Sequence, residues 1–494
     1  MFGPLFLTRS RRLALVSIVV AVILTIALSS PHGHSIRHSF GKYTERVRPS
    51  KPAAAASPEA KNKPKPKQPK YLKEPEWIPP PVQDPFPSLA TSPPPPIPAW
   101  NVPKKDLHKE YGLAYAPPLF IGFTRGWPML LQAVVSYITA GWPAEQIYVV
   151  ENTGTQWANP DGRLSLQNPF YLDHRLLKQK LRVNVVRTPV LLNFAQLQNF
   201  YVHLAHEHRW PQYFWSHMDV VALSWEDGHE GRPRPGQDGY RTLYENALAE
   251  LNDTLRSRDR WATRFFAYDA FTLVNRAAYD DVGGWDTYIP YYITDCDMHS
   301  RLLMHNWTLG DRTAGIIGDV STALTDLRVL YRDPSAEMGF TDPNPAAPQD
   351  KQDKRDKRDK RDKRDKRDKR KIREKRDNRD NTEEETAHAA TKHDESSTSE
   401  AAALQYWQKL RETVAEMERY KHGSRGRNTW QASQRGGQGE PYYYPARGVQ
   451  TAFEMLTEAG RRIYAEKWGH QNCDLLGEGG LKLEDQWRVQ HDWE

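Results

Sequence analysis

The sequence predicts an α/β fold with a mostly parallel sheet flanked by helices, and three observations lead to it. Between residues 115 and 335, short apolar runs alternate with longer segments in which apolar residues recur at helical spacing. Such alternation is typical of parallel strands joined by right-handed helical crossovers. Several runs end in polar or acidic residues, and ligands of these sheets bind beyond the carboxyl ends of the strands. We therefore expect one catalytic or binding domain over residues 115–335.

The first half of this domain supplies three predicted strands, at residues 119–124, 147–151 and 182–188. Pro128 suits the first turn of a helix that follows the first strand and reaches about Ala140. A second helix is predicted at 193–208, because Phe194, Leu197, Tyr201 and Leu204 fall along one face. A fourth apolar strand, at 213–223, completes the parallel core.

The second half is predicted as a helix at 240–256, a strand at 264–276, a Gly283-Gly284 loop and a further helix. Thr294-x-x-Asp297 has the pattern of a capping box, so this helix is expected to begin there. Beyond the domain, residues 401–420 and 449–468 read as amphipathic helices of a cap over 401–494. Trp407, Leu410, Val414 and Met417 mark one face of the first.

The amino terminus predicts a membrane anchor. Three arginines, at positions 9, 11 and 12, precede a run from 13 to 28 that contains no charge. With two following serines, the run barely reaches the length needed to span a bilayer. We expect a cytoplasmic tail at 1–12, a signal-anchor at 13–30 and type II topology, which places the rest in the lumen. A cleaved signal peptide is the alternative interpretation.

Two segments have compositions that cannot bury a core. Residues 31–110 are rich in Pro and Lys and predict an extended stem. Residues 341–400 form a charged insert in which 353–370 is six consecutive Asp-Lys-Arg triplets. A period of three matches neither a helix face nor a heptad, so we expect disorder or a transient single helix.

Charge and cysteine content narrow the function classes. The net charge of +7 arises from about +12 in residues 1–73 and +9 in 351–380, which leaves −14 on the remainder. An acidic body makes nucleic acid an improbable partner. The two cysteines, Cys296 and Cys473, can pair in an oxidising lumen. Asn252 and Asn306 begin glycosylation sequons that also fit a lumenal body.

Two motifs carry the chemistry. The predicted strand at 213–223 contains His217-Met218-Asp219 after an apolar run. Downstream, Gly283, Gly284 and Trp285 lead through an aromatic turn to Thr294-Asp295-Cys296-Asp297 and then Arg301-Leu302.

In this order, the motifs resemble those of nucleotide-sugar glycosyltransferases of the GT-A fold, family-2-like, of the type II membrane kind found in the fungal Golgi or ER. Two positions depart from the family pattern: His217 stands for its first Asp, and Thr294 stands for its Glu. The resemblance covers about residues 119–309.

The resemblance implies roles for individual residues. Asp219 and His217 would hold Mn²⁺ or Mg²⁺, with His217 better suited to Mn²⁺. Thr124, Arg125, Glu151 and Asp219 would bind the donor. Asp295 would be the catalytic base, and the acceptor would contact Gly283, Gly284, Trp285 and Asp297, although Asp297 also reads as a helix cap.

The function expected from this resemblance is transfer of a hexosyl-type sugar from a nucleotide-diphosphate donor to a glycan, glycoprotein or glycolipid in the Golgi or ER lumen. The departures at His217 and Thr294 motivate an alternative, a catalytically inactive lumenal binding or complex subunit. A membrane-tethered scaffold that uses the charged insert is the third hypothesis.

Overall fold

The computed structural model describes residues 68–71, 81–341, 395–425, 436–442, 445–477 and 479–493. The chain forms two compact units, Met1–Glu74 and Pro75–Glu494, and the second contains the helices and strands of the described residues. The predicted tail, the predicted anchor, much of the stem and the Asp-Lys-Arg repeat lie outside the described residues. Within the described part, no helix is long and apolar enough to cross a bilayer.

A seven-stranded mixed sheet forms the centre of this second unit, with strand order β3-β2-β1-β4-β7-β6-β8. Its strands are β1 Leu119–Phe123, β2 Ile147–Glu151, β3 Asn184–Arg187, β4 Gln212–Ser216, β6 Trp261–Ala267, β7 Phe271–Asn275 and β8 Thr308–Asp311. All neighbours pair in parallel except β7, which is antiparallel to both β4 and β6. The prediction of a mostly parallel α/β sheet is confirmed.

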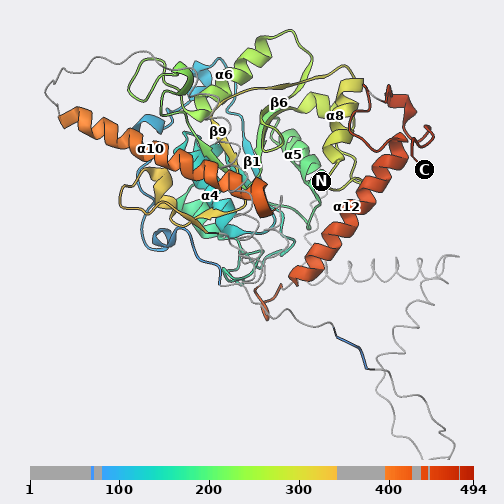
Figure 1. Ribbon diagram of the computed structural model, residues 1–494, viewed down its shortest axis with the longest axis horizontal. Coiled ribbons are helices and arrows are strands. Elements are labelled where there is room, and N and C mark those ends of the chain that lie inside the picture. Colours follow the sequence, from blue (N-terminus) through green and yellow to red (C-terminus); the bar gives the residue numbers. More distant parts are fainter. Residues whose placement is uncertain are drawn as a thin grey trace, which may run out of the picture. The chain divides into compact units, whose positions relative to one another are not determined.

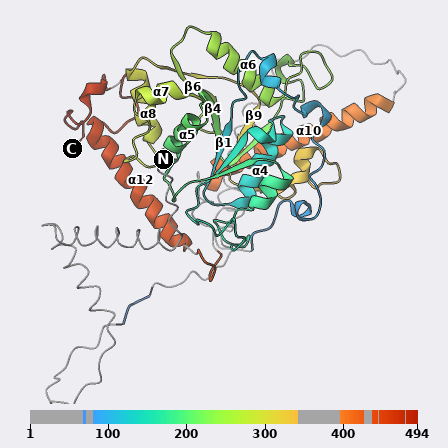
Figure 2. The same ribbon diagram turned by 180° about the vertical axis from the view of Figure 1, so that it is seen from behind.

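Helices flank the sheet and connect its strands (Figures 1 and 2). They are α4 Trp127–Thr139, α5 Phe194–Glu207, α6 Leu243–Arg256, α7 Arg276–Asp281 and α8 Thr294–Met304. Shorter helical turns lie at Pro87–Ala90, Ala99–Asn101, Leu107–Glu110 (α3), Ala144–Gln146, Leu176–Lys180, His229–Gly231, Leu327–Tyr331 and Leu483–Asp485. Pro128 stands in the first turn of α4, as predicted. Capping boxes begin α5 at Asn193 and α6 at Thr242, where the side chains accept backbone hydrogen bonds three residues on.

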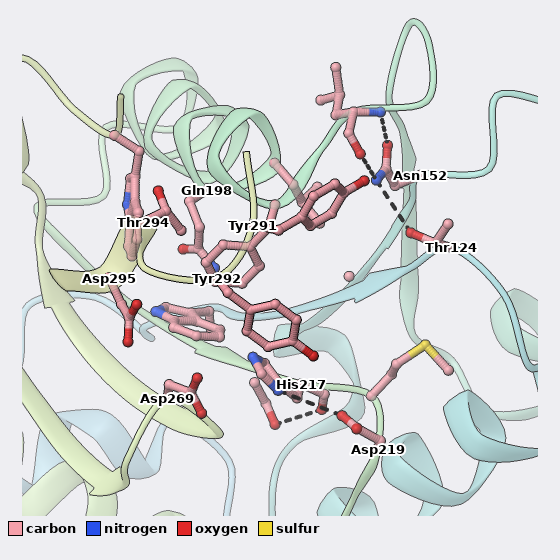
Figure 3. A pocket seen from close by; sticks show the side chains of 18 of the residues that line it. Thr124, Asn152, Gln198, His217, Asp219, Asp269, Tyr291, Tyr292, Thr294 and Asp295 are labelled. Atoms are coloured by element: carbon pink, nitrogen blue, oxygen red, sulfur yellow. Dashed lines mark hydrogen bonds and ion pairs between the residues drawn. The ribbon is translucent and has the colours of Figure 1, made fainter. Parts of the chain in front are cut away.

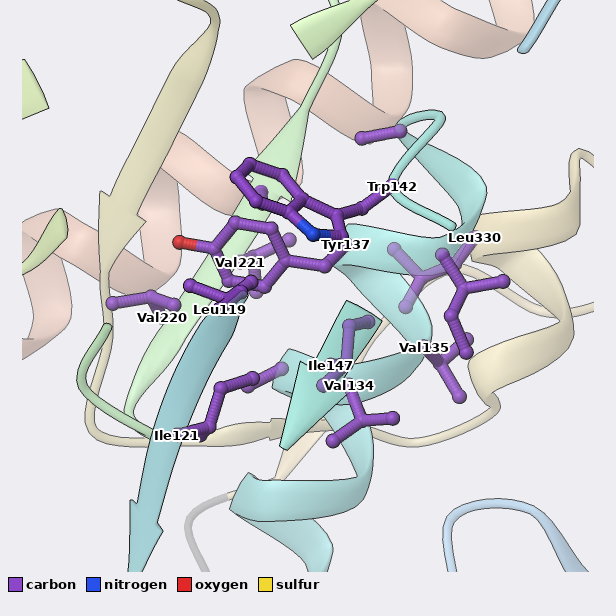
Figure 4. Close-up of a cluster of buried hydrophobic side chains, with 14 of the residues drawn as sticks. Leu119, Ile121, Val134, Val135, Tyr137, Trp142, Ile147, Val220, Val221 and Leu330 are labelled. Carbon is purple, nitrogen blue, oxygen red and sulfur yellow. The ribbon is translucent and has the colours of Figure 1, made fainter. Parts of the chain in front are cut away.

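The largest hydrophobic core lies between the sheet and α4, which is buried along its whole length (Figure 4). Trp142, just after α4, packs edge-on against Phe214 of β4 with ring centroids 5.2 Å apart. The helix is buried on every side because β5 (Val220–Leu223) and the turn at Leu327–Tyr331 also contact it. The core therefore fixes the carboxyl ends of β1 and β4 relative to each other.

One predicted strand, 213–223, is in fact two. β4 ends at Ser216, and β5 (Val220–Leu223) leaves the main sheet to pair antiparallel with β9 (Ile316–Asp319). The predicted strand at 264–276 is likewise a hairpin of β6 and β7, and Asp269 in its turn adopts a left-handed φ of 49°. A further pair, β10 (Ala323–Leu324) with β11 (Phe340–Thr341), completes the strands. Both apolar runs bend because polar residues interrupt them at the sheet edge.

The helix α10 spans Glu395–Tyr420, whereas the sequence predicted a helix over 401–420. The predicted stripe of Trp407, Leu410, Val414 and Met417 is buried, as expected. A β-carbon on Gly318 of β9 would lie 2.4 Å from Val414, so only glycine permits this close approach of α10. A π-helical turn, Lys421–Arg425, follows directly.

The last long helix, α12 (Ala446–Trp468), lies beside α8 in both ribbon views (Figures 1 and 2). A disulfide joins Cys296 of α8 to Cys473 across 177 residues of sequence, with the Cα atoms 5.1 Å apart. The pairing that the sequence permitted is therefore present. It fixes α8 to the carboxyl-terminal segment.

Candidate functional site

A cavity of about 400 Å³ opens at the carboxyl edge of the parallel strands, where ligands of α/β sheets bind. Its walls come from the ends of β1, β2 and β4, the β6–β7 turn, the start of α8, and one face of α12. Figure 3 shows Asp295 and Asp269 on one side, Thr124 and Asn152 on the other, and Tyr291 and Tyr292 between them. Several elements distant in sequence thus meet at one site.

Asn152 and Arg125 shape the end of the cavity beside β1 and β2. The Asn152 amide donates to the Leu192 carbonyl at 2.8 Å and accepts from the Leu192 N–H at 2.7 Å, which fixes the loop before α5. It also donates to Thr124 Oγ1 at 3.4 Å. Arg125 is only 8% exposed, and burial lowers its pKa to about 10, so it stays charged at neutral pH.

Buried polar atoms without a partner gather around this cavity. Buried polar groups are normally hydrogen-bonded, so such atoms need an explanation. In the described part of the chain, those on cavity-lining residues with no protein partner are Arg125 Nε, Gln198 Oε1, Trp215 Nε1, His217 Nε2, Thr272 Oγ1, Trp285 Nε1 and Thr294 Oγ1. Because their residues line the cavity, these atoms are candidates for hydrogen bonds to a polar ligand.

A buried charge cluster forms one wall of the cavity. Lys421 Nζ lies 2.7 Å from Asp219 Oδ2 and also contacts Asp319 Oδ1. Burial opposes the charge of Lys421, but its two carboxylate partners outweigh burial and raise the pKa of the ammonium group. Burial likewise opposes ionisation of Asp219, yet Lys421 and then His217 lower the pKa of its carboxyl. Lys421 and Asp219 are therefore ionised together.

Strand pairing brings the two acids together. The Val320 N–H donates to the Asp219 carbonyl at 2.8 Å, and β5 pairs with β9 in a register that sets Val220 opposite Asp319. Lys421 follows the buried stripe of α10, seven residues after Val414. The sequence patterns did not identify Asp319 or Lys421 as site residues. The spacing of Lys421 after Val414 and Met417 was a signal that could have identified it.

The residues predicted to bind a metal do not fit one. Asp219 Oδ2 already accepts from Lys421, and His217 Nδ1 lies 3.6 Å from Asp219 Oδ1. A divalent ion on Asp219 would lie close to the ammonium group of Lys421. Two unit charges 4 Å apart interact by about 4 kcal/mol at an effective dielectric of 20. The ammonium group would therefore repel a doubly charged ion by about twice that energy. No cluster of three or more His, Cys, Asp or Glu suited to a metal occurs among the described residues.

Asp295, the predicted catalytic base, lies on the cavity wall. It is the second residue of α8, half-buried on the cavity wall, and Tyr268 Oη donates to its Oδ2 at 2.8 Å. His299, one turn later, is enclosed by the rings of Phe265, Tyr268 and Trp285. Asp295 thus faces a cavity, as the sequence predicted. Its catalytic role stays a prediction.

His299 should make stability depend on pH. Burial lowers its pKa to about 4, with the Asp295 charge opposing, whereas an unfolded histidine titrates near 6.5. Between these values the unfolded chain binds a proton that the folded chain does not. Falling pH should therefore destabilise the fold by up to about 1.4 kcal/mol per pH unit between about 6.5 and 4. Urea unfolding of His299→Asn should show a shallower acid dependence; a slope equal to wild type would contradict this.

Asp297 lies outside the cavity, and its predicted roles do not fit. The residue is fully buried, Arg301 Nε donates to it at 2.8 Å, and Lys467 and Trp468 contact its other oxygen at 2.7 and 3.0 Å. The capping-box prediction is wrong, because Ile293 precedes the first turn and no side chain caps it. The carboxylate neutralises two buried cations instead of capping the helix or contacting an acceptor.

Gly283, Gly284 and Glu151 also lie away from the cavity lining. Arg301 donates to the carbonyls of Val282 and Gly284, and a β-carbon on Gly284 would lie 2.6 Å from Asn199 Oδ1. Gly284 thus packs on α5, whereas Gly283 is exposed, and neither glycine lines the cavity. The Glu151 carboxylate accepts from Asn159 and contacts His174, both within 2.8 Å. Thr124, Arg125, His217, Asp219, Trp285 and Asp295 do line the cavity.

Comparisons with known proteins give no family assignment. No protein-family model matches the chain, and no curated protein matches it. Among solved structures, one similar chain is a cytidylyltransferase from Leptospira borgpetersenii serovar Hardjo-bovis, at 10% identity and a TM-score of 0.24, over 40% of this chain and 75% of that one. Another is a mannosyltransferase from Pyrobaculum calidifontis in complex with GDP-Man and Mn²⁺, at 10% identity and a TM-score of 0.27, over 42% and 60%. At these scores neither likeness carries an argument about this protein.

Proposed function

We propose that this protein is a glycosyltransferase of the GT-A type, which binds a nucleotide-diphosphate sugar in the cavity at the carboxyl edge of the sheet. The observation that carries the proposal is a buried, charged Arg125 in a cavity lined by other unpaired polar atoms. A buried guanidinium that pairs with no carboxylate of the described residues favours an anionic ligand, and a diphosphate suits its donors. The unpaired amide, hydroxyl and indole groups suit a base, ribose or sugar.

The transfer step needs a base and a stabilised leaving group. We assign the base to Asp295, which would take the proton from an acceptor hydroxyl as that oxygen attacks the anomeric carbon with inversion. The bond between the anomeric carbon and the phosphate oxygen breaks, and the nucleoside diphosphate leaves with the electron pair. Arg125 would stabilise the negative charge on that diphosphate.

The proposed setting is the secretory lumen, with the chain anchored by residues 13–30 in type II topology. The disulfide between Cys296 and Cys473 supports an oxidising compartment, since such bonds are rare in the cytosol. The acceptor proposed is a hydroxyl of a glycan, glycoprotein or glycolipid. The bound acceptor would be covered by apolar residues of α12 that line the cavity, among them Ala452, Phe453 and Leu456.

Calorimetric titration of the full chain with uridine and guanosine diphosphate sugars tests the proposal. Arg125→Gln should weaken binding by about 10- to 100-fold, because a hydrogen bond to a charged group is worth about 1.5–3 kcal/mol. Arg264→Gln is the matched control: Arg264 is also a buried guanidinium, 2% exposed, but it lies on β6 outside the cavity lining. Its loss should leave binding unchanged.

The outcomes separate the candidate functions. Binding by none of the nucleotide sugars would reject the glycosyltransferase proposal. Equal losses in both arginine variants would mean that the effect comes from folding. Binding without transfer to any acceptor would favour the inactive lumenal subunit, which the histidine at position 217 first suggested.

A further inference from the structure

The cluster of Asp219, Lys421 and Asp319 lies where the donor diphosphate is proposed to bind. All three residues line the cavity, together with Arg125. The Lys421 side chain is 2% exposed, and its ammonium group contacts one oxygen of each acid. A lysine ammonium has three N–H donors, so two reach the carboxylates and a third can serve a ligand.

A similar cluster elsewhere in the fold does not line the cavity. Lys467 is also buried, with 4% of its side chain exposed, and lies 2.8 Å from Asp286 and 2.7 Å from Asp297. None of these three residues lines the cavity. Among the residues that the structure describes, a buried lysine thus lies between two acids at Lys421 and at Lys467, and of these two Lys421 lines the cavity.

We propose that Lys421 replaces a divalent metal ion as the cation beside the donor diphosphate, so that this protein binds its donor without metal. The inference rests on the proposed function, because it assigns the cation of that same site. Asp219 and Asp319 then hold the ammonium in position, and Arg125 adds the second positive charge.

Charge and geometry support this assignment. Asp219 and Asp319 alone would form an acidic pair suited to a hard divalent cation. The ammonium already occupies the space between them and contacts both, so a metal ion would have to displace it. His422 Nε2, 3.1 Å from Asp319 Oδ2, covers another oxygen of the same acid. The carboxylates are thus committed to protein cations.

The first test uses the wild-type full chain with UDP and GDP as probes, titrated once with EDTA and once with Mn²⁺. For the nucleotide that binds more tightly, the affinity measured with EDTA and the affinity measured with Mn²⁺ should agree within about 3-fold. This is well below the tenfold difference that corresponds to 1.4 kcal/mol. Binding that appears only with Mn²⁺ would overturn the inference and leave the proposed function standing. Failure of both nucleotides in both conditions would reject the proposed function instead.

The second test compares Lys421→Met with Lys467→Met. Without Lys421, affinity in EDTA should fall about 10-fold or more, as expected for a lost hydrogen bond to a charged group, and Mn²⁺ should restore it by occupying the freed acid pair. Lys467→Met should lower thermal stability without creating a response to Mn²⁺. Unchanged binding of Lys421→Met in EDTA would show that Lys421 is structural and overturn the inference.

A readout on the free wild-type protein remains if Lys421→Met does not fold. Electron paramagnetic resonance of Mn²⁺ titrated into the protein should show no stoichiometric site, because Lys421 excludes it. One tightly bound ion per chain, lost in Asp219→Asn, would overturn the inference without any use of nucleotide.

Discussion

Asp295→Asn is expected to lower turnover by about 10²- to 10⁴-fold, the range for loss of a general base. Donor affinity should hardly change, because the cations proposed to bind the diphosphate, Arg125 and Lys421, are separate residues. The fold should also persist: asparagine retains an oxygen that can accept the hydrogen bond from Tyr268 Oη, now 2.8 Å long. Transfer rates and calorimetric affinities, measured on the same preparation, check both parts.

Tyr268→Phe provides the control for this experiment. It removes the hydrogen bond to Asp295 and keeps the carboxylate, so its effect on turnover should be much smaller than that of Asp295→Asn. Full turnover in Asp295→Asn would show that another group accepts the proton. Loss of donor affinity in that variant would place Asp295 in the donor site.

Asp297→Asn should cause a large loss of stability, about 3–5 kcal/mol, which is typical when one partner of a buried ion pair is removed. The change would leave Arg301 and Lys467 with one fewer negative charge in a site that excludes water. Urea unfolding at neutral pH measures it. A loss near 1 kcal/mol, as for a helix cap, would instead restore the sequence-based interpretation.

Two further variants isolate the buried charge of Asp297. Asp286→Asn removes the other acid beside Lys467, but Asp286 is more exposed and Lys467 keeps Asp297, so its cost should be smaller. Combining Asp297→Asn with Lys467→Met removes both charges of one pair. The double variant should lose less than the sum of the single losses, because the uncompensated lysine is gone.

Local periodicity predicted most of the fold. The strands at β1 and β2, the start of α4 at Pro128 and the buried stripe of α10 all follow from spacing of apolar residues, and the structure confirms them. These elements could be predicted because each buries a continuous face against the sheet. The period of the pattern reports that burial directly.

The parts that were missed depend on contacts between distant segments. Asp319 reaches Asp219 only because β5 leaves the sheet to pair with β9, about one hundred residues later in the chain. Nothing local to Asp297 shows that Lys467 will neutralise it, so its spacing from Thr294 suggested a cap. Lys421 is different, because it continues the spacing of the α10 stripe just past the end of that helix. A charge in line with an apolar face is a reason to look for a buried partner.

The bond between Cys296 and Cys473 also determines what survives cleavage of the backbone. The Asp-Lys-Arg repeat at 353–370, rich in the residues after which trypsin cuts, lies between the two cysteines in the sequence. A single cut there would convert the protein into a two-chain molecule whose halves stay joined by the disulfide. The longer half would carry the sheet with Asp219 and Asp295, and the shorter would carry Lys421. Such a nicked protein would migrate as one species until a reductant released the fragment that completes its cavity.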